Sequence, residues 1–193
     1  MIPWMVVAQF AISLLVVTIA HELGHMLVAR RLGIPIKRIT WGFGPTLWRR
    51  PWGQDSELVV RALPTGMSVG VPMRRTSDGR AIRPIEHDIL LAAGGPLASL
   101  LLALALSASL LLFAGSAPVQ LWLISTALLS ALLAILNLIP VPGLDGGHLL
   151  LLVAARFGWE LKPHQEIKAH RLGMRLTLLL CLGLTATVAV RWL

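Results

Sequence analysis

The stretch that decides the fold is residues 4–29, WMVVAQFAISLLVVTIAHELGHMLVA, an apolar run of helical length that ends in the motif HELGH at 21–25. Helical spacing places His21 and His25 on one face, about one turn apart, where both can bind one metal ion. Glu22 lies between them and can act as a general base on a water at that metal. The alternative is a buried polar cluster that packs this helix against another. Because an ionisable side chain near the bilayer centre costs roughly 2.5–3.5 kcal/mol on insertion scales, the motif favours a metal site.

The composition is typical of a polytopic membrane protein. Of 193 residues, 56% are hydrophobic and 13% are charged, and the mean hydropathy is +0.77, which is too apolar for a soluble domain of this length. A membrane-spanning helix needs about 20 apolar residues. We therefore predict an all-α polytopic membrane protein, a single domain over 1–193, with about four spans: 4–29, 90–114, 119–157 broken at 140–143, and 172–190.

The basic residues are unevenly distributed. Eleven of the 17 Lys and Arg residues lie within 30–83 and five within 156–175, whereas the segments 1–20 and 115–120 contain none. By the positive-inside rule, we expect the basic 30–86 segment in the cytoplasm and both termini on the other side of the membrane. These residues would also attract anionic lipid. Topology already explains the charge and no nucleic-acid motif accompanies it, so we expect no nucleic-acid partner.

Between the first two spans lies an insertion, 32–86, that is not a domain with a large core of its own. Its runs 57–63 (ELVVRAL) and 66–73 (GMSVGVPM) carry strand-forming residues between Gly and Pro breakers. They predict a small cytoplasmic or membrane-associated β element.

The third apolar run ends in NLIPVPGLDGGH, residues 137–148. Two prolines and a glycine in four residues unwind the backbone, and irregular backbone at membrane depth is tolerated only inside protein or beside a watery cavity. Whether 144–157 completes the span or re-enters the membrane stays open. Because a catalytic zinc site has three protein ligands, Asp145 is the best candidate for the third, with His148 as the rival ligand.

Three further features have structural interpretations. In the second span, small residues recur every four positions and predict close helix packing: Gly95, Ser99, Ala103 and Ser107. The single Cys181 excludes an intramolecular disulfide and a Cys-based zinc site. The N-terminal run lacks the positive segment of a signal peptide, so we expect it to be a retained span.

With these motifs assembled, the chain resembles the site-2 protease family of intramembrane zinc metalloproteases. The resemblance rests on residues 20–48 (AHELGHMLVARRLGIPIKRITWGFGPTLW), 92–104 (AAGGPLASLLLAL) and 137–151 (NLIPVPGLDGGHLLL). These stretches look most like the bacterial branch that cleaves membrane-bound anti-sigma factors and remnant signal peptides, which implies the bacterial inner membrane. We expect neither the PDZ domains of that branch nor the CBS domain of the sporulation branch here.

The resemblance implies one zinc ion per chain with three ligands: His21, His25 and Asp145. It makes Glu22 the general base and Asn137 a polar residue near the active site. It also implies a core of three helices, with zinc below the cytoplasmic surface. Ser99 stands where the family commonly has Asn, which weakens any assignment of a substrate-positioning role to the second span.

The implied activity is hydrolysis of peptide bonds within or near transmembrane segments of membrane proteins. Because a helix hides its carbonyls in hydrogen bonds, the substrate has to unwind, and its extended segment could pair with the strand edge at Gly66–Val71. The candidate substrate-binding residues are Gly66, Met67, Ser68, Val69, Gly70 and Asn137. A separate regulatory partner is compatible with this interpretation.

Two alternatives come from other functional classes. An inactive homologue could bind membrane clients without cutting them, but the intact HELGH and LDG motifs argue against it. A zinc transporter could use the same ligands. Transport calls for further ionisable residues along a path, and the second and third apolar runs offer none before Asp145.

Overall fold

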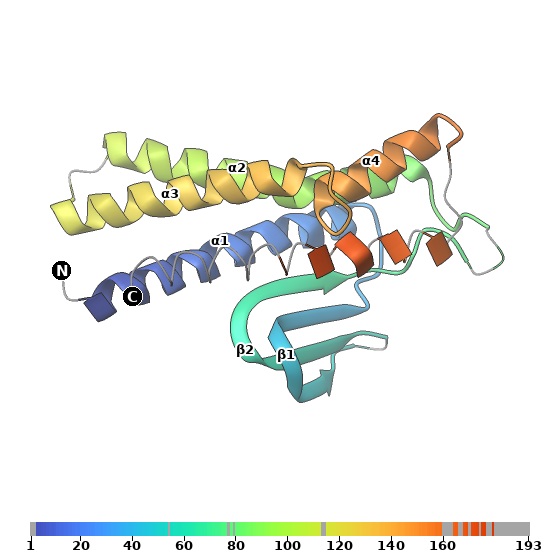
Figure 1. The fold of residues 1–193 in the computed structure, drawn as a ribbon, viewed down its shortest axis with the longest axis horizontal. Coiled ribbons are helices and arrows are strands. Elements are labelled where there is room, and N and C mark those ends of the chain that lie inside the picture. Colours follow the sequence, from blue (N-terminus) through green and yellow to red (C-terminus); the bar gives the residue numbers. More distant parts are fainter. Residues whose placement is uncertain are drawn as a thin grey trace. The chain divides into compact units, whose positions relative to one another are not determined.

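The computed structural model describes residues 3–53, 55–76, 78, 80–112 and 115–159, together with 164, 165, 168, 169, 171–173, 175, 176 and 179. Its elements are helix α1 (Pro3–Arg31), strands β1 (Arg38–Pro51) and β2 (Glu57–Gly70), and helices α2 (Ile85–Leu112), α3 (Ala117–Leu138) and α4 (Asp145–Arg156) (Figure 1). The chain falls into two compact units, Met1–Met73 with Leu90–Leu136, and Arg74–Ile89 with Asn137–Leu193.

Three helices among the described residues are long and apolar enough to cross a membrane: α1, α2 and α3. Large apolar side chains on α2 and α3 are exposed, including Leu101, Leu111 and Leu128. Such surfaces suit lipid rather than water. The structure is that of a mostly helical membrane protein with a small sheet after its first helix, as predicted. The fourth predicted span, 172–190, and Cys181 within it lie largely outside the described residues.

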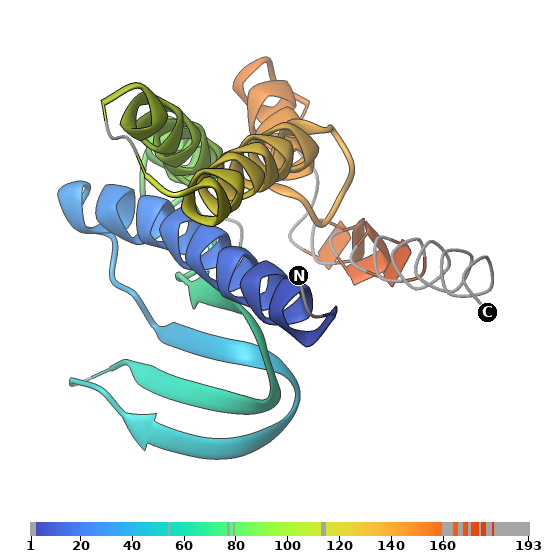
Figure 2. The ribbon, with the colours of Figure 1, turned by 90° about the vertical axis from the view of Figure 1, so that its left-hand side faces the viewer.

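In the first unit, α1 lies beside α2 and α3 (Figure 2). The contact between α1 and α2 depends on glycine, since a Cβ built on Gly24 would lie 2.2 Å from the carbonyl oxygen of Gly94. Buried hydroxyls join the other pairs of helices. The hydroxyls of Ser13 on α1 and Thr126 on α3 are 2.8 Å apart, and Ser130 Oγ of α3 donates to the Ser99 carbonyl of α2 at 2.7 Å. These contacts hold the three helices in register.

The sheet consists of two long strands, β1 and β2, and each of them bends into two arms. Residues 38–41 pair in parallel with 57–60. On their other side they pair with 67–70, and because the partner numbers fall along this segment, the second pairing is antiparallel. Residues 48–51 pair with the far side of 57–60. Both predicted strand runs thus contribute to β2, and β1 supplies a strand between them that the sequence did not predict.

Glycine makes the bend in β1 possible. Gly42 and Gly44 have φ of 87° and 86°, a region that other residues rarely adopt. A Cβ on Gly42 would also lie 2.3 Å from the Leu63 carbonyl oxygen. Where α1 ends, Ala29, Ile34 and Leu91 form a small buried core, with Val71 packed against it. This core holds the end of β2 near the end of α1.

In the second unit, α3 ends at Leu138 and α4 begins at Asp145, with irregular backbone between them. A Cβ on Gly146 would lie 2.3 Å from the Leu138 carbonyl oxygen, and one on Gly147 would lie 2.1 Å from that of Val141. The two glycines after Asp145 therefore let the 139–144 loop fold tightly against the start of α4. With 12 residues, α4 is too short to cross a bilayer alone.

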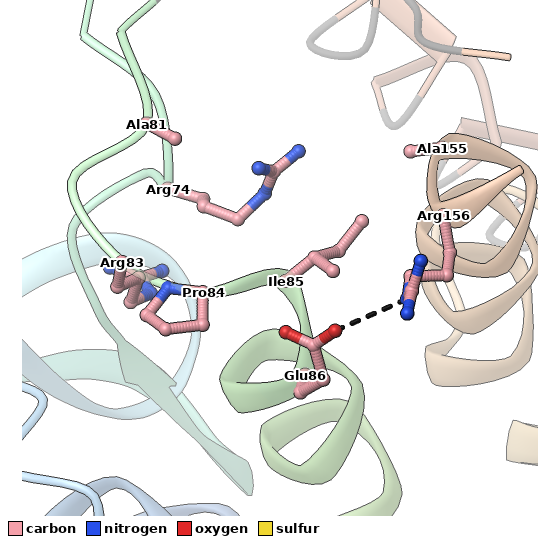
Figure 3. A pocket seen from close by; sticks show the side chains of 8 residues that line it. All are labelled: Arg74, Ala81, Arg83, Pro84, Ile85, Glu86, Ala155 and Arg156. Carbon is pink, nitrogen blue, oxygen red and sulfur yellow. Dashed lines mark ion pairs between the residues drawn. The ribbon is translucent and has the colours of Figure 1, made fainter. Parts of the chain in front are cut away.

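The second unit also contains an open hollow of about 310 Å³ (Figure 3). Arg156 from the end of α4 pairs there with Glu86 from the first turn of α2 at 3.2 Å. Two further arginines at the hollow pair with Asp88, Arg83 at 2.7 Å and Arg74 at 3.7 Å. None of the predicted site residues is among the described residues that line it.

Candidate metal centre and active site

The two histidines of the motif point one ring nitrogen each at a common space. His21 is 6% exposed, and its ring centroid lies 5.0 Å from that of His25, one turn further along α1. A Cβ built on Gly95 of α2 would lie 2.6 Å from His21 Nε2 and 2.3 Å from His25 Nε2. Both nitrogens therefore face the space that Gly95 leaves open, and any side chain at this position would fill it.

The other nitrogen of each ring is held by α2. His25 Nδ1 lies 2.7 Å from the Leu91 carbonyl oxygen. Because a carbonyl can only accept, Nδ1 carries the proton and Nε2 of the neutral ring keeps its lone pair. His21 Nδ1 lies 2.9 Å from Ser99 Oγ. A histidine that bonds the protein through one nitrogen and presents the other is typical of metal ligation, and such imidazoles suit zinc.

Glu22, between the histidines in the sequence, contacts the sheet. The Val69 N–H donates a hydrogen bond to Glu22 Oε2 at 3.0 Å. Val69 belongs to the 67–70 arm of β2, whose opposite side pairs with 38–41. In Figure 1 this end of β2 lies below α1. The outer edge of the sheet is therefore adjacent to the predicted general base.

The predicted substrate-binding residues 66–70 all lie in β2. The Gly70 carbonyl accepts from the Lys37 N–H at 2.8 Å, so the backbone of Gly70 faces inward, and that of Val69 faces outward. Since strand backbone groups alternate, Ser68 also faces inward and Met67 outward. Among the described residues, no strand pairs with this outer side.

The other predicted site residues lie in the second unit, and all three are partly buried. Asn137 is the penultimate residue of α3, and Asp145 is the first residue of α4. His148 lies in the first turn of α4, where its N–H donates to the Leu144 carbonyl at 3.1 Å. The ligand role of Asp145, and the choice between it and His148, stay predictions.

Sequence reasoning missed Ser99 as a partner of His21. The signal was available, since Ser99 follows Gly95 by four residues and so shares its face of α2. The contact of Val69 with Glu22 had no comparable signal, because the two residues are distant in the sequence.

Comparisons with known proteins find similarity to metalloproteases. The profile of peptidase family M50 matches residues 9–121 and 114–184. A putative zinc metalloprotease of Xylella fastidiosa (strain Temecula1) is 35% identical over 111 residues, 53% of this chain and 24% of that protein. Zinc metalloprotease Rip1 of Mycobacterium tuberculosis (strain H37Rv) is 45% identical over 60 residues, 31% of this chain and 15% of that protein.

A solved structure, the site-2 protease from Methanocaldococcus jannaschii, superposes on this chain with a TM-score of 0.62 at 25% sequence identity. The match covers 98% of this chain and 72% of that one. The chain belongs to peptidase family M50, the family of the site-2 proteases. It spans about a quarter or less of the length of the curated relatives it matches.

Proposed function

We propose that this chain is a zinc-dependent intramembrane protease that hydrolyses peptide bonds within or near transmembrane segments of membrane proteins. The observation that carries the proposal is the convergence of His21 Nε2 and His25 Nε2 on the space at Gly95, with Glu22 between them in the sequence. Membership of family M50 and three helices of membrane-spanning length support it.

One zinc ion per chain would be held by His21, His25 and Asp145. Catalytic zinc sites have three protein ligands and an open position, and a carboxylate is a common third ligand. Asp145 offers such a carboxylate at the start of α4. When bound, zinc supplies Lewis-acid chemistry, since it polarises a carbonyl and makes a water molecule more acidic.

The protein's own groups handle the protons. Glu22 takes a proton from the attacking water and passes it to the leaving amine. The Val69 amide holds Oε2 of this carboxylate and so restricts its orientation. His21 and His25 keep their Nδ1 atoms bonded to α2 throughout, which fixes both rings. Asn137 is a polar group that could hydrogen-bond the substrate backbone.

The substrate segment would unwind and add as a strand to the outer side of residues 66–70. Backbone hydrogen bonds supply affinity in this mode of recognition. Met67 faces outward and offers both its N–H and its carbonyl, whereas Val69 offers only its carbonyl, because its N–H already donates to Glu22 Oε2. A segment bound along this edge would therefore run past the general base.

The setting we propose is a bacterial inner membrane, with the basic 30–86 segment in the cytoplasm, both termini outside it and a fourth span at 172–190. The positive-inside rule supports this orientation. The substrate class is a single transmembrane segment, such as an anti-sigma factor or a signal-peptide remnant. A separate regulatory partner would select substrates, and no nucleic acid takes part.

The metal content of purified variants tests this ligand set. Wild-type protein should hold about one zinc per chain, and His21→Ala, His25→Ala and Asp145→Ala should each lower it, because three ligands leave little redundancy. His148→Ala is the matched comparison. Wild-type occupancy in Asp145→Ala combined with loss in His148→Ala would reassign the third ligand, and wild-type protein without zinc would overturn the proposed function.

A further inference from the structure

Ser99 is a fully buried hydroxyl that reaches the metal motif from α2. Ser99 is 0% exposed, and its Oγ lies 2.9 Å from His21 Nδ1. Buried polar atoms are costly unless they are hydrogen-bonded, and this contact satisfies a hydroxyl and a ring nitrogen at once. Because no water can easily replace a partner at such a position, the bond constrains the His21 ring.

We infer that Ser99 is a positioning residue that sets the tautomer and orientation of His21, an inference that rests on the proposed zinc site. For a neutral His21 to present the Nε2 lone pair to a metal, Nδ1 has to carry the proton, and Ser99 Oγ is then its acceptor. The Leu91 carbonyl does the same for His25. Thus α2 holds both rings through Nδ1, once by backbone and once by side chain.

Ser99 also contacts a third helix, through its backbone carbonyl. Ser130 Oγ of α3 donates to the Ser99 carbonyl at 2.7 Å, and Ser130 is also 0% exposed. This bond joins α3 to the helical backbone of α2, whereas the Ser99 hydroxyl acts on α1. The two hydroxyls are equally buried and both join neighbouring helices, but only that of Ser99 touches a histidine of the motif. A comparison of the two hydroxyls therefore distinguishes a role in positioning His21 from a role in packing the helices.

The test compares zinc affinity in the full-length protein purified in detergent, measured by competition with a chelator. Ser99→Ala removes the acceptor and should raise the zinc dissociation constant about 10–100-fold, the usual cost of losing a group that orients a metal ligand. Ser99→Thr restores a hydroxyl and should recover most of the affinity. Ser130→Ala, which removes an equally buried interhelical bond, should leave the affinity close to that of wild type.

A second readout is the visible absorption of the cobalt-substituted protein, which reports the ligand geometry directly. Ser99→Ala should shift this spectrum, and Ser130→Ala should not. Equal zinc affinity in wild type and Ser99→Ala would overturn the inference. So would equal losses in Ser99→Ala and Ser130→Ala, or a Thr variant as weak as the Ala variant. Wild-type protein that binds no zinc would instead overturn the proposed function.

Discussion

The Val69 N–H donates a hydrogen bond to Glu22 Oε2 at 3.0 Å, which joins the outer edge of the sheet to the motif in α1. Glu22 lies in a helix of membrane-spanning length, and Val69 lies in the β2 strand. The carboxylate of the proposed base is therefore oriented by a backbone amide. A change of side chain at Val69 keeps this bond, whereas loss of the amide removes it.

Val69→Pro should slow cleavage, because proline has no N–H to orient Glu22. A misplaced catalytic group can cost on the order of 100-fold in rate, so we expect a loss approaching that size. Val69→Ala keeps the amide and should cleave at close to the wild-type rate. The cleavage rates are compared at matched zinc occupancy, which neither variant should change. Similar rates in the two variants would remove the proposed role of the amide.

Met67→Pro tests strand addition without touching the Glu22 contact. The backbone of Met67 faces outward, so proline removes a donor that the substrate would use, and cleavage should fall relative to Met67→Ala. Ser68→Pro is the contrasting variant, because the Ser68 backbone faces the 38–41 strand. Loss of the Ser68 N–H should therefore lower the melting temperature instead. Equal cleavage by Met67→Pro and Met67→Ala would point to recognition by the helices.

Gly95→Ala should strip the protein of zinc. Its new Cβ would lie 2.3 Å from His25 Nε2 and 2.6 Å from His21 Nε2, in the space where both nitrogens point. Gly115→Ala is the control, since its nearest contact would be an ordinary 3.5 Å from Val119 Cγ1. Zinc per chain is measured by elemental analysis. A Gly95→Ala protein with full zinc content would show that the metal is bound elsewhere.

Much of the helical part of this fold follows from local patterns. The apolar run before His21 predicted α1, and the small residues of the second apolar run predicted close packing of α2. The ligand spacing of His21 and His25 is likewise a local property of a helix. Such features depend on residues within a few turns of one another, and a single sequence displays them directly.

The contribution of β1 was not predictable in the same way. Its residues 38–41 are a short run, and Gly42, Gly44 and Pro45 follow at once, a pattern typical of a loop. The strand exists because it lies between two arms of β2, which is a long-range effect. The contact between Glu22 and Val69 is long-range as well.

The proposed orientation is tested with single cysteines in a Cys181→Ser background. An impermeant maleimide applied to intact cells should label Ser116→Cys and spare Ser77→Cys, because the basic 30–86 segment is expected in the cytoplasm. Labelling after the membrane is permeabilised provides the control for reactivity. The reverse pattern in intact cells would invert the topology.

The central claim, that Glu22 is the general base of a zinc protease, is tested most directly by the cleavage rate of Glu22→Gln measured alongside its zinc content. The amide preserves the shape of the side chain but cannot accept a proton at neutral pH, so cleavage should fall by at least about 100-fold. Zinc content should stay at the wild-type level, because Glu22 is not a proposed ligand. A Glu22→Gln protein that retains zinc and cleaves at close to the wild-type rate would contradict the claim.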